Sequence, residues 1–145
     1  MKTQEFLKQL EKERLVTAIR EAESGNSGDV VLFISHKNVV EAMSEARAVF
    51  DRLKLEQTTP QNSVLIFVAP KAQKLAVIGG TDLYAKLPVE WWTTLVSNIT
   101  TQFSEGRLTE GLLTALEQIG IEQRRYFPIQ PTFNRDGQRD LLEEN

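Results

Sequence analysis

The chain has 145 residues, of which 41% are hydrophobic and 26% are charged, a composition typical of one globular domain. It has no cysteine, which excludes disulfide bonds, thiolate zinc sites and a cysteine nucleophile. The formal net charge of −3 argues against a broad nucleic-acid-binding surface. No window approaches the roughly 20 apolar residues that a membrane span requires, and the charged N-terminus lacks the apolar run of a signal peptide. We therefore expect a soluble, cytoplasmic domain.

The first half of the chain reads as a helix and strand followed by a second helix and strand. Apolar residues at helical spacing predict an amphipathic helix over residues 3–24, ended by the glycines of SGNSGD. VVLFIS at 30–35 is apolar on both faces of its pleat, as expected of a central strand covered on each side. A second helix is expected over about residues 38–55, and SVLIFVA at 63–69 predicts another buried strand. A strand–helix–strand unit of this kind gives two parallel strands.

The second half supplies one more strand and two more helices. The short connection PKAQK leads into LAVIG at 75–79, and a link of this length predicts an antiparallel hairpin. One helix begins near Pro88 with Trp92 on its apolar stripe, and another carries GLLTALEQIG. From residue 124 onward, prolines and charges predict mostly loop or frayed tail.

These elements predict a fold with helices on both faces of a sheet. Strands that are apolar on both faces must be covered on both faces. We therefore expect a three-layer α/β/α sandwich with a small mixed sheet, formed by a single domain over residues 1–128 and followed by a polar C-terminal tail over residues 129–145.

The order of the motifs resembles the TPM domain family, in particular its stand-alone branch. The resemblance covers residues 6–128 and rests on AIREAE, SGD, the pair Thr58 and Asn62 before VLIFVA, AVIG, a tryptophan-bearing helix, GLLTALEQIG and YFP. It implies a Rossmann-like α/β/α sandwich and an acid-lined site for calcium or magnesium at one end of the sheet. Some members are credited with acid phosphatase activity, and for others a role in assembly or repair of membrane complexes has been proposed.

The chain departs from the family's motifs at this implied metal site. Where members read IGD.G followed by HEK.GDEFW, this chain reads VIGGTDLYAKLPVEWW. The expected aspartate is Gly80, and the following His, Glu and Asp are Tyr84, Ala85 and Val89. Asp82 stands where the family has its second glycine, and the family's HFP reads YFP. Several side-chain oxygens of the implied site are therefore missing.

The candidate metal ligands that remain are Asp82 and Asp29, beside a candidate site loop of Gly79, Gly80 and Thr81. A glycine pair at the end of a strand can direct backbone N–H groups toward a ligand, but the stretch contains no dinucleotide or P-loop fingerprint. The alternative is a turn that needs positive φ angles, with Asp29 stabilising its own turn. Calcium needs six to eight oxygen ligands and magnesium a near-octahedral set, so two aspartates predict only weak binding.

Three further residues are candidates for a functional role, each of which we weigh against a purely structural role. His36, the only histidine, follows a strand and is expected to be a partly exposed loop residue rather than a general base. Trp91 lies off the apolar stripe that holds Trp92 and is a candidate anchor for a protein partner. Tyr126 follows Arg124 and Arg125 in a basic-aromatic cluster that could attract a phosphate, although arginines there also complement a helix dipole.

Three functions remain open. We favour a TPM-like domain that binds an unknown protein partner, or weakly binds calcium or magnesium, without efficient catalysis. The second is a metal-dependent acid phosphatase, which requires acids gathered around an ion. The third is a structural or assembly module that binds a protein through the face holding Trp91 and YFP.

Overall fold

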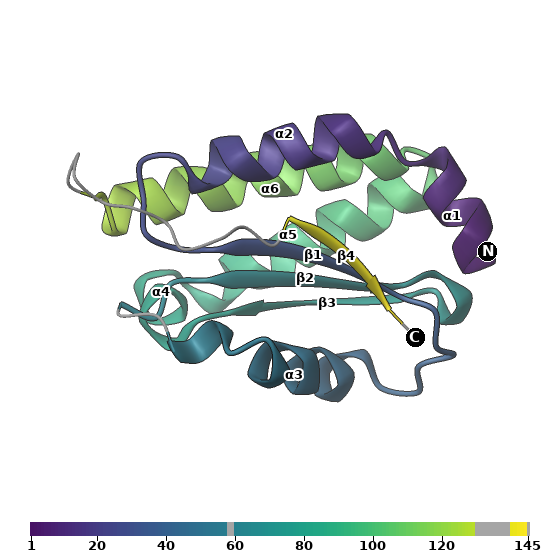
Figure 1. Ribbon diagram of the computed structural model, residues 1–145, viewed down its shortest axis with the longest axis horizontal. Coiled ribbons are helices and arrows are strands. Elements are labelled where there is room, and N and C mark those ends of the chain that lie inside the picture. The colour runs from purple at the N-terminus through teal and green to yellow at the C-terminus, as the bar shows by residue number, and fades with distance from the viewer. Residues whose placement is uncertain (58–59, 130–139, 145) are drawn as a thin grey trace.

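The computed structural model describes residues 1–57, 60–129 and 140–144, and its layers are those of an α/β sandwich (Figure 1). The described strands form one sheet in the order β3-β2-β1-β4. Their bounds are Val30–Ser35 for β1, Val64–Ala69 for β2, Lys74–Gly79 for β3 and Leu141–Glu144 for β4. β2 and β4 are parallel to β1, whereas β3 is antiparallel to β2. The small mixed sheet and the hairpin are therefore confirmed.

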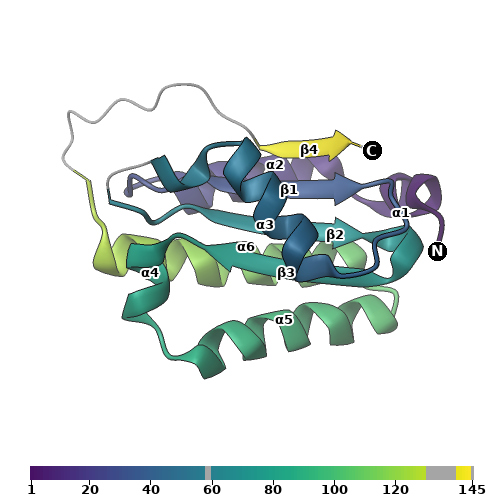
Figure 2. The same ribbon diagram turned by 90° about the horizontal axis from the view of Figure 1, so that it is seen from below.

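Helices cover both faces of this sheet (Figure 2). α2 (Lys12–Glu23), α5 (Val89–Ser104) and α6 (Leu108–Tyr126) pack on one face, and α3 (Ala42–Arg52) packs on the other. Leu32 and Ile34 of β1 point into the first layer, whereas Val31 and Phe33 point toward α3. The run VVLFIS is apolar at every position because both of its faces are buried.

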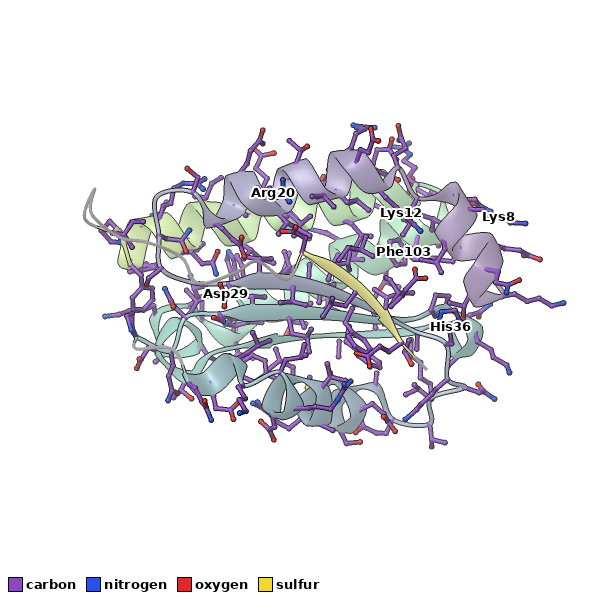
Figure 3. The ribbon with its side chains drawn as sticks, in the orientation of Figure 1. Lys8, Lys12, Arg20, Asp29, His36 and Phe103 are labelled. Atoms are coloured by element: carbon purple, nitrogen blue, oxygen red, sulfur yellow. The ribbon has the colours of Figure 1, made fainter. Side chains whose placement is uncertain are left out.

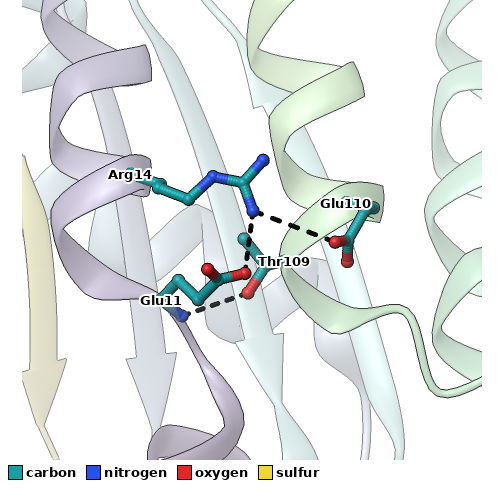
Figure 4. A network of polar contacts seen from close by, with 4 residues as sticks. All are labelled: Glu11, Arg14, Thr109 and Glu110. Atoms are coloured by element: carbon teal, nitrogen blue, oxygen red, sulfur yellow. Dashed lines mark hydrogen bonds and ion pairs between the residues drawn. The ribbon is translucent and has the colours of Figure 1, made fainter.

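The prediction of one continuous helix over residues 3–24 is wrong. The segment forms α1 (Thr3–Gln9) and α2, with extended backbone at the buried Leu10 between them. The N–H of Glu11 donates to the hydroxyl of Thr109 at 3.1 Å, and Arg14 pairs with the carboxylates of Glu11 (2.8 Å) and Glu110 (3.9 Å) (Figure 4). These contacts with the start of α6 fix the break, although no proline or glycine marks it.

Two other helices differ from expectation at their ends. α3 begins at Ala42 rather than near residue 38, because the carboxylate of Glu41 accepts hydrogen bonds from the N–H groups of Met43 (3.0 Å) and Ser44 (2.8 Å). A short helix, α4 (Thr81–Lys86), separates β3 from α5. Single 3₁₀ turns lie at Leu55–Gln57 and Pro70–Ala72.

The prediction of loop or frayed tail from residue 124 onward is wrong at both ends of that segment. α6 continues to Tyr126, and residues 141–144 form β4. Leu141 packs against the core on the α2 side of the sheet and Leu142 against the core on the α3 side, so β4 is held by apolar contacts as well as by β1. None of the described helices is long and apolar enough to cross a lipid bilayer.

Candidate functional site

The antiparallel hairpin places the predicted site residues at one edge of the sheet. β1 and β2 begin where β3 ends, since the register pairs Val30 with Val64 and Val64 with Gly79. Asp29, just before β1, therefore lies at the same edge as residues 79–82. We call this edge, with Asp29, the segment 61–63 and residues 79–82, the glycine edge.

Asp82 forms two hydrogen bonds with Gln61 at the glycine edge. Its carboxylate oxygen Oδ2 accepts a hydrogen bond from the N–H of Gln61 at 2.7 Å, and its own N–H donates to the carbonyl of Gln61 at 2.9 Å. These two bonds fasten the first turn of α4 to the segment that leads into β2. The side chain itself is exposed, as is that of Thr81.

The glycines of this edge are explained by close packing. A Cβ at Gly80 would lie 2.5 Å from the carbonyl oxygen of Gln61, and one at Gly79 would lie 2.4 Å from the ring of Trp92. A Cβ at Gly28 would lie 2.6 Å from the carbonyl oxygen of Asn62. The expected need for positive φ is wrong, because Gly80 has a φ of −58° and Gly79 is not among the positive-φ glycines.

The two candidate metal ligands lie on either side of the segment before β2. β2 separates β1 from β3, so neighbouring ends of β1 and β3 lie about 10 Å apart, twice the usual strand spacing; Asp29 precedes β1, and Asp82 follows β3 in the first turn of α4. The backbone N–H of Asp29 donates to the hydroxyl of Ser63 at 3.1 Å. Among the described residues, no three Asp, Glu or His side chains gather as a metal-ligating group. Two carboxylates so placed fit at most a loosely held dication that keeps most of its water ligands.

Asn62, of the expected Thr58 and Asn62 pair, is buried at the glycine edge, whereas Thr58 lies outside the described residues. The Asn62 side chain forms a hydrogen bond with the hydroxyl of Ser27 at 3.2 Å. Its backbone carbonyl accepts one from the side-chain amide of Gln123 at 2.9 Å. Buried amides thus join α6 to the loops of this edge.

His36 lies at the opposite edge from the aspartates. Asp29 precedes β1 and His36 follows it, and a strand of this length spans about 17 Å (Figure 3). His36 is partly exposed, as the sequence predicted. The only histidine therefore does not share a site with Asp29 or Asp82.

A large cleft among the described residues lies at this opposite edge, where sequence reasoning placed no site. It is a cleft of about 710 Å³ at the carboxyl end of β2, bounded by α1, the hairpin and the end of α5. Its apolar wall includes Phe6, Val68, Leu75, Phe103 and Leu108. These residues come from many elements, so they form no local sequence motif. The only guide to this cleft in the sequence is the general rule that ligands bind beyond the carboxyl ends of parallel strands.

Two charged side chains of this cleft, Lys74 and Glu41, have structural partners. Lys74 donates from its ammonium group to the carbonyl of Val40. Hydrogen bonds from Ser44, through its side chain and then its backbone, and from the N–H of Met43 lower the pKa of Glu41. Lys74 adds a smaller electrostatic contribution in the same direction. The cleft is therefore mainly an apolar cavity with one cation and one anion at its rim.

Trp91 lies at the other end of the molecule, half-buried in a shallow groove of about 390 Å³ between α5 and α6. Its ring meets that of the buried Trp92 edge-on at 4.9 Å. The groove also includes Ile121, one and a half turns before Tyr126. Exposed large apolar side chains also lie on α4, at the start of α5 and at the end of α6. Together with the half-buried Trp91 we call this set the aromatic end: Tyr84, Val89, Trp91, Ile121 and Tyr126.

The arginines beside Tyr126 pair with protein groups. The guanidinium of Arg124 donates to the carbonyls of Glu21 (3.1 Å) and Ala22 (3.3 Å), at the C-terminal end of α2. Arg125 pairs with Glu122 at 3.4 Å. The expected interaction of an arginine with a helix C-terminus is thus present, but Arg124 caps α2 rather than its own helix.

Comparison with known proteins agrees with this fold. No curated protein sequence matches the chain. The structure is similar to the NMR structure of the BA42 protein from the psychrophilic bacterium Bizionia argentinensis, with 26% sequence identity, a TM-score of 0.80 and 91% of each chain covered. It also resembles the N-terminal domain of the cg2496 protein from Corynebacterium glutamicum, at 12% identity and a TM-score of 0.54 over 83% of this chain and 78% of that one, which is a likeness of fold alone. The family model of the TPM domain matches residues 1–121, and the chain therefore belongs to the TPM domain family.

Proposed function

We propose that this TPM domain binds a protein partner, that it is not an efficient catalyst, and that it holds calcium or magnesium only weakly. The observation that carries the proposal is the reciprocal pair between Asp82 and Gln61, at 2.7 and 2.9 Å. It commits Asp82, the acid that follows the glycine pair, to holding a loop. The absence of cysteine is in keeping with the cytoplasmic location that we propose.

The arrangement of the titratable groups favours binding over phosphate-ester hydrolysis. A metal-dependent phosphatase needs several acids around an ion that activates water. Here Asp29 precedes β1 and Asp82 follows β3, two strands that are not adjacent, and His36 lies at the far end of β1. Any dication bound at the glycine edge would rest on these two aspartates, and it would supply only a weak electrostatic contact there.

The aromatic end is the surface that we assign to the partner. Trp91 is partly exposed, which retains it as a candidate anchor. Ile121 lines the same groove and is 41% exposed, and Val89, at the start of α5, is 59% exposed. Tryptophan and tyrosine dominate the binding energy of many protein interfaces when a partner covers them. Glu90 and Glu122 line the groove around Trp91, which gives the apolar centre a polar rim.

Isothermal titration and an aryl phosphate assay test the catalytic half of the proposal. We expect calcium and magnesium to bind with millimolar or weaker affinity and no phosphate release that responds to a chelator. The variant Asp82→Asn should behave like the wild type in both measurements, as should Asp51→Asn, an exposed acid on α3. Chelator-sensitive turnover that is lost in Asp82→Asn alone would overturn the proposal in favour of the phosphatase.

Site-specific photocrosslinking in cells tests the partner-binding half. A photoreactive amino acid at Val89 or Ile121 should yield one discrete protein adduct, whereas the same group at the exposed Glu13 or Thr17 of α2 should not. Ile121→Ser should remove the adduct formed from Val89 while leaving the thermal unfolding midpoint nearly unchanged, because Ile121 is exposed. Equal adducts from all four positions would count against the aromatic end as the interface.

A further inference from the structure

β4 covers the lateral edge of the sheet, along the side of β1, which would otherwise be open. Its four residues pair in parallel with β1 from Leu32 to Ser35 (Figures 1 and 2). The N–H of Leu32 donates to the carbonyl of Asp140 at 3.0 Å, and the N–H of His36 donates to the carbonyl of Glu144 at 3.0 Å. An uncovered edge presents such groups to any extended peptide of suitable sequence, and many domains bind peptides in this way.

Three cations from two helices flank this edge, and each pairs with an acid of the segment that forms β4. Two of them, Lys12 and Arg20, project from α2 beside β4 (Figure 3). The pairs are Arg20 with Asp140 at 3.2 Å, Lys12 with Glu143 at 3.8 Å, and Arg52 of α3 with Glu144 at 3.2 Å. We call the edge of β1 with these three cations the basic edge.

The side chains of β4 alternate between the two faces of the sheet. Leu141 and Leu142 point to opposite faces of the sheet, toward the α2 and α3 sides respectively. Two residues after each leucine, on the same face, comes an acid that meets a cation of the basic edge. The segment that lies at the basic edge therefore has the order acid, apolar, apolar, acid, acid.

The segment is held by contacts that are individually weak. The three cationic side chains are between 52% and 58% exposed, and exposed ion pairs contribute at most about 1 kcal/mol each. Both leucines are only partly buried. Four residues with so little buried area are expected to open locally without unfolding the sheet.

We propose that the basic edge is a recognition site for an extended acidic segment of a partner protein, and that residues 140–144 are an internal occupant which the partner segment replaces. The site is separate from the aromatic end, and it does not depend on the function proposed above. Charge complementarity identifies the class of ligand, since cations on both faces of the sheet meet acids at alternate positions of one strand.

Amide hydrogen exchange of the intact chain gives the first test. The amides of Leu32 and His36, which donate to the segment, should exchange at least about tenfold faster than those of Val64 and Ile66 in the central strand β2. If Leu32 and His36 exchange only as slowly as the central strand, β4 is an integral part of the sheet and the proposal is overturned.

Peptide binding gives the second test. The probe is a fluorescent peptide with the sequence of residues 139–145, and the receptor is the full chain carrying Leu141→Asn and Leu142→Asn, which loosen the internal segment. We expect this variant to bind the peptide at least about tenfold more tightly than the wild type, because occupancy by the internal segment lowers the apparent affinity. A control peptide with Asn and Gln in place of its three acids should bind at least about tenfold more weakly at low salt.

Variants on the receptor side complete the design. Adding Arg20→Glu and Arg52→Glu to the loosened chain should abolish peptide binding, whereas adding Arg125→Glu at the aromatic end should not. If the folded loosened chain binds neither peptide, the proposal fails. If light scattering instead shows a wild-type dimer that dissociates in the loosened chain, the occupant is the segment of a second copy, and a separate acidic partner is excluded. Should the loosened chain not fold, the exchange rates of the wild type decide.

Discussion

Gly80 stands where members of the family carry an aspartate, and the carbonyl oxygen of Gln61 lies 2.5 Å from the place where a side chain would start. That separation is shorter than any normal contact, and the neighbour is backbone, which cannot rotate away. An acid can therefore not be restored at this position unless the segment 61–62 moves.

We expect Gly80→Asp to lower the free energy of unfolding by about 1–3 kcal/mol, the usual cost of overpacking, without creating tight calcium binding. Urea denaturation and calorimetric titration measure the two effects. Thr81→Asp is the matched control, because Thr81 is exposed and the same charge is added without a clash. If the Gly80→Asp variant is as stable as the wild type, the segment 61–62 can move aside at little cost in free energy.

Glu41 provides a pH-dependent contribution to stability. Its pKa is lowered from the usual 4.5 by hydrogen bonds from Ser44 and Met43 at the start of α3. A carboxyl with a lowered folded-state pKa contributes stability above its unfolded pKa, and this is lost as the pH falls through the folded value. Glu41→Gln should therefore lower the unfolding midpoint near neutral pH, and the two midpoints should converge as the pH falls through the lowered folded-state pKa of Glu41. Glu45→Gln, one turn further along α3, should leave the wild-type pH profile unchanged.

At the scale of elements, the break between α1 and α2 depends on one hydroxyl group. Thr109 is 3% exposed, and its oxygen accepts the N–H of Glu11 at 3.1 Å. Thr109→Val keeps the shape of the side chain and removes the acceptor, so we expect a loss of about 1–2 kcal/mol in the free energy of unfolding. Thr114→Val, on the exposed face of the same helix, is the control. Equal losses in the two variants would mean that the hydroxyl does not fix the break.

The elements that sequence reasoning found are those coded by local pattern. The strands predicted at 30–35, 63–69 and 75–79 match β1, β2 and β3 to within one residue, because each is an apolar run bounded by turn residues. The helix break and β4 were missed because residues about 100 positions away determine them, Thr109 for the break and β1 for the final strand. Local periodicity carries no information about such contacts.

The candidate site likewise combines features that the local sequence predicts with features that depend on distant contacts. The antiparallel hairpin follows from a short connection, and it accounts for Asp29 and Asp82 lying at one edge of the sheet. The pair between Asp82 and Gln61 was not predictable, because Gln61 lies 21 residues away in a loop without a motif. The cleft was missed for a further reason, since it exists only when α1, the hairpin and α5 are brought together.

At the scale of the molecule, exposed apolar groups gather at two ends. Among the described residues, the exposed large hydrophobic side chains near the cleft are Met1, Val40 and Met43, and all the others lie at the aromatic end. The cleft end is closed in part by α1, a helix of seven residues whose Phe6 packs edge-on against Phe103 at 5.6 Å. Access to the cleft therefore depends on how firmly this short helix is docked.

Phe6→Ala tests whether α1 moves as a unit separate from the sheet. Phe6 is 3% exposed and lines the cleft, so its removal takes away the main apolar anchor of α1. We expect the α1 amides to exchange at least about tenfold faster while those of β1 and β2 stay protected, and an apolar fluorescent dye to bind more strongly in the widened cleft. Lys8→Ala, an exposed change in the same helix, should do neither. If protection falls equally throughout the sheet, α1 unfolds only with the whole domain, and the cleft is then a fixed cavity rather than one that a short helix can open.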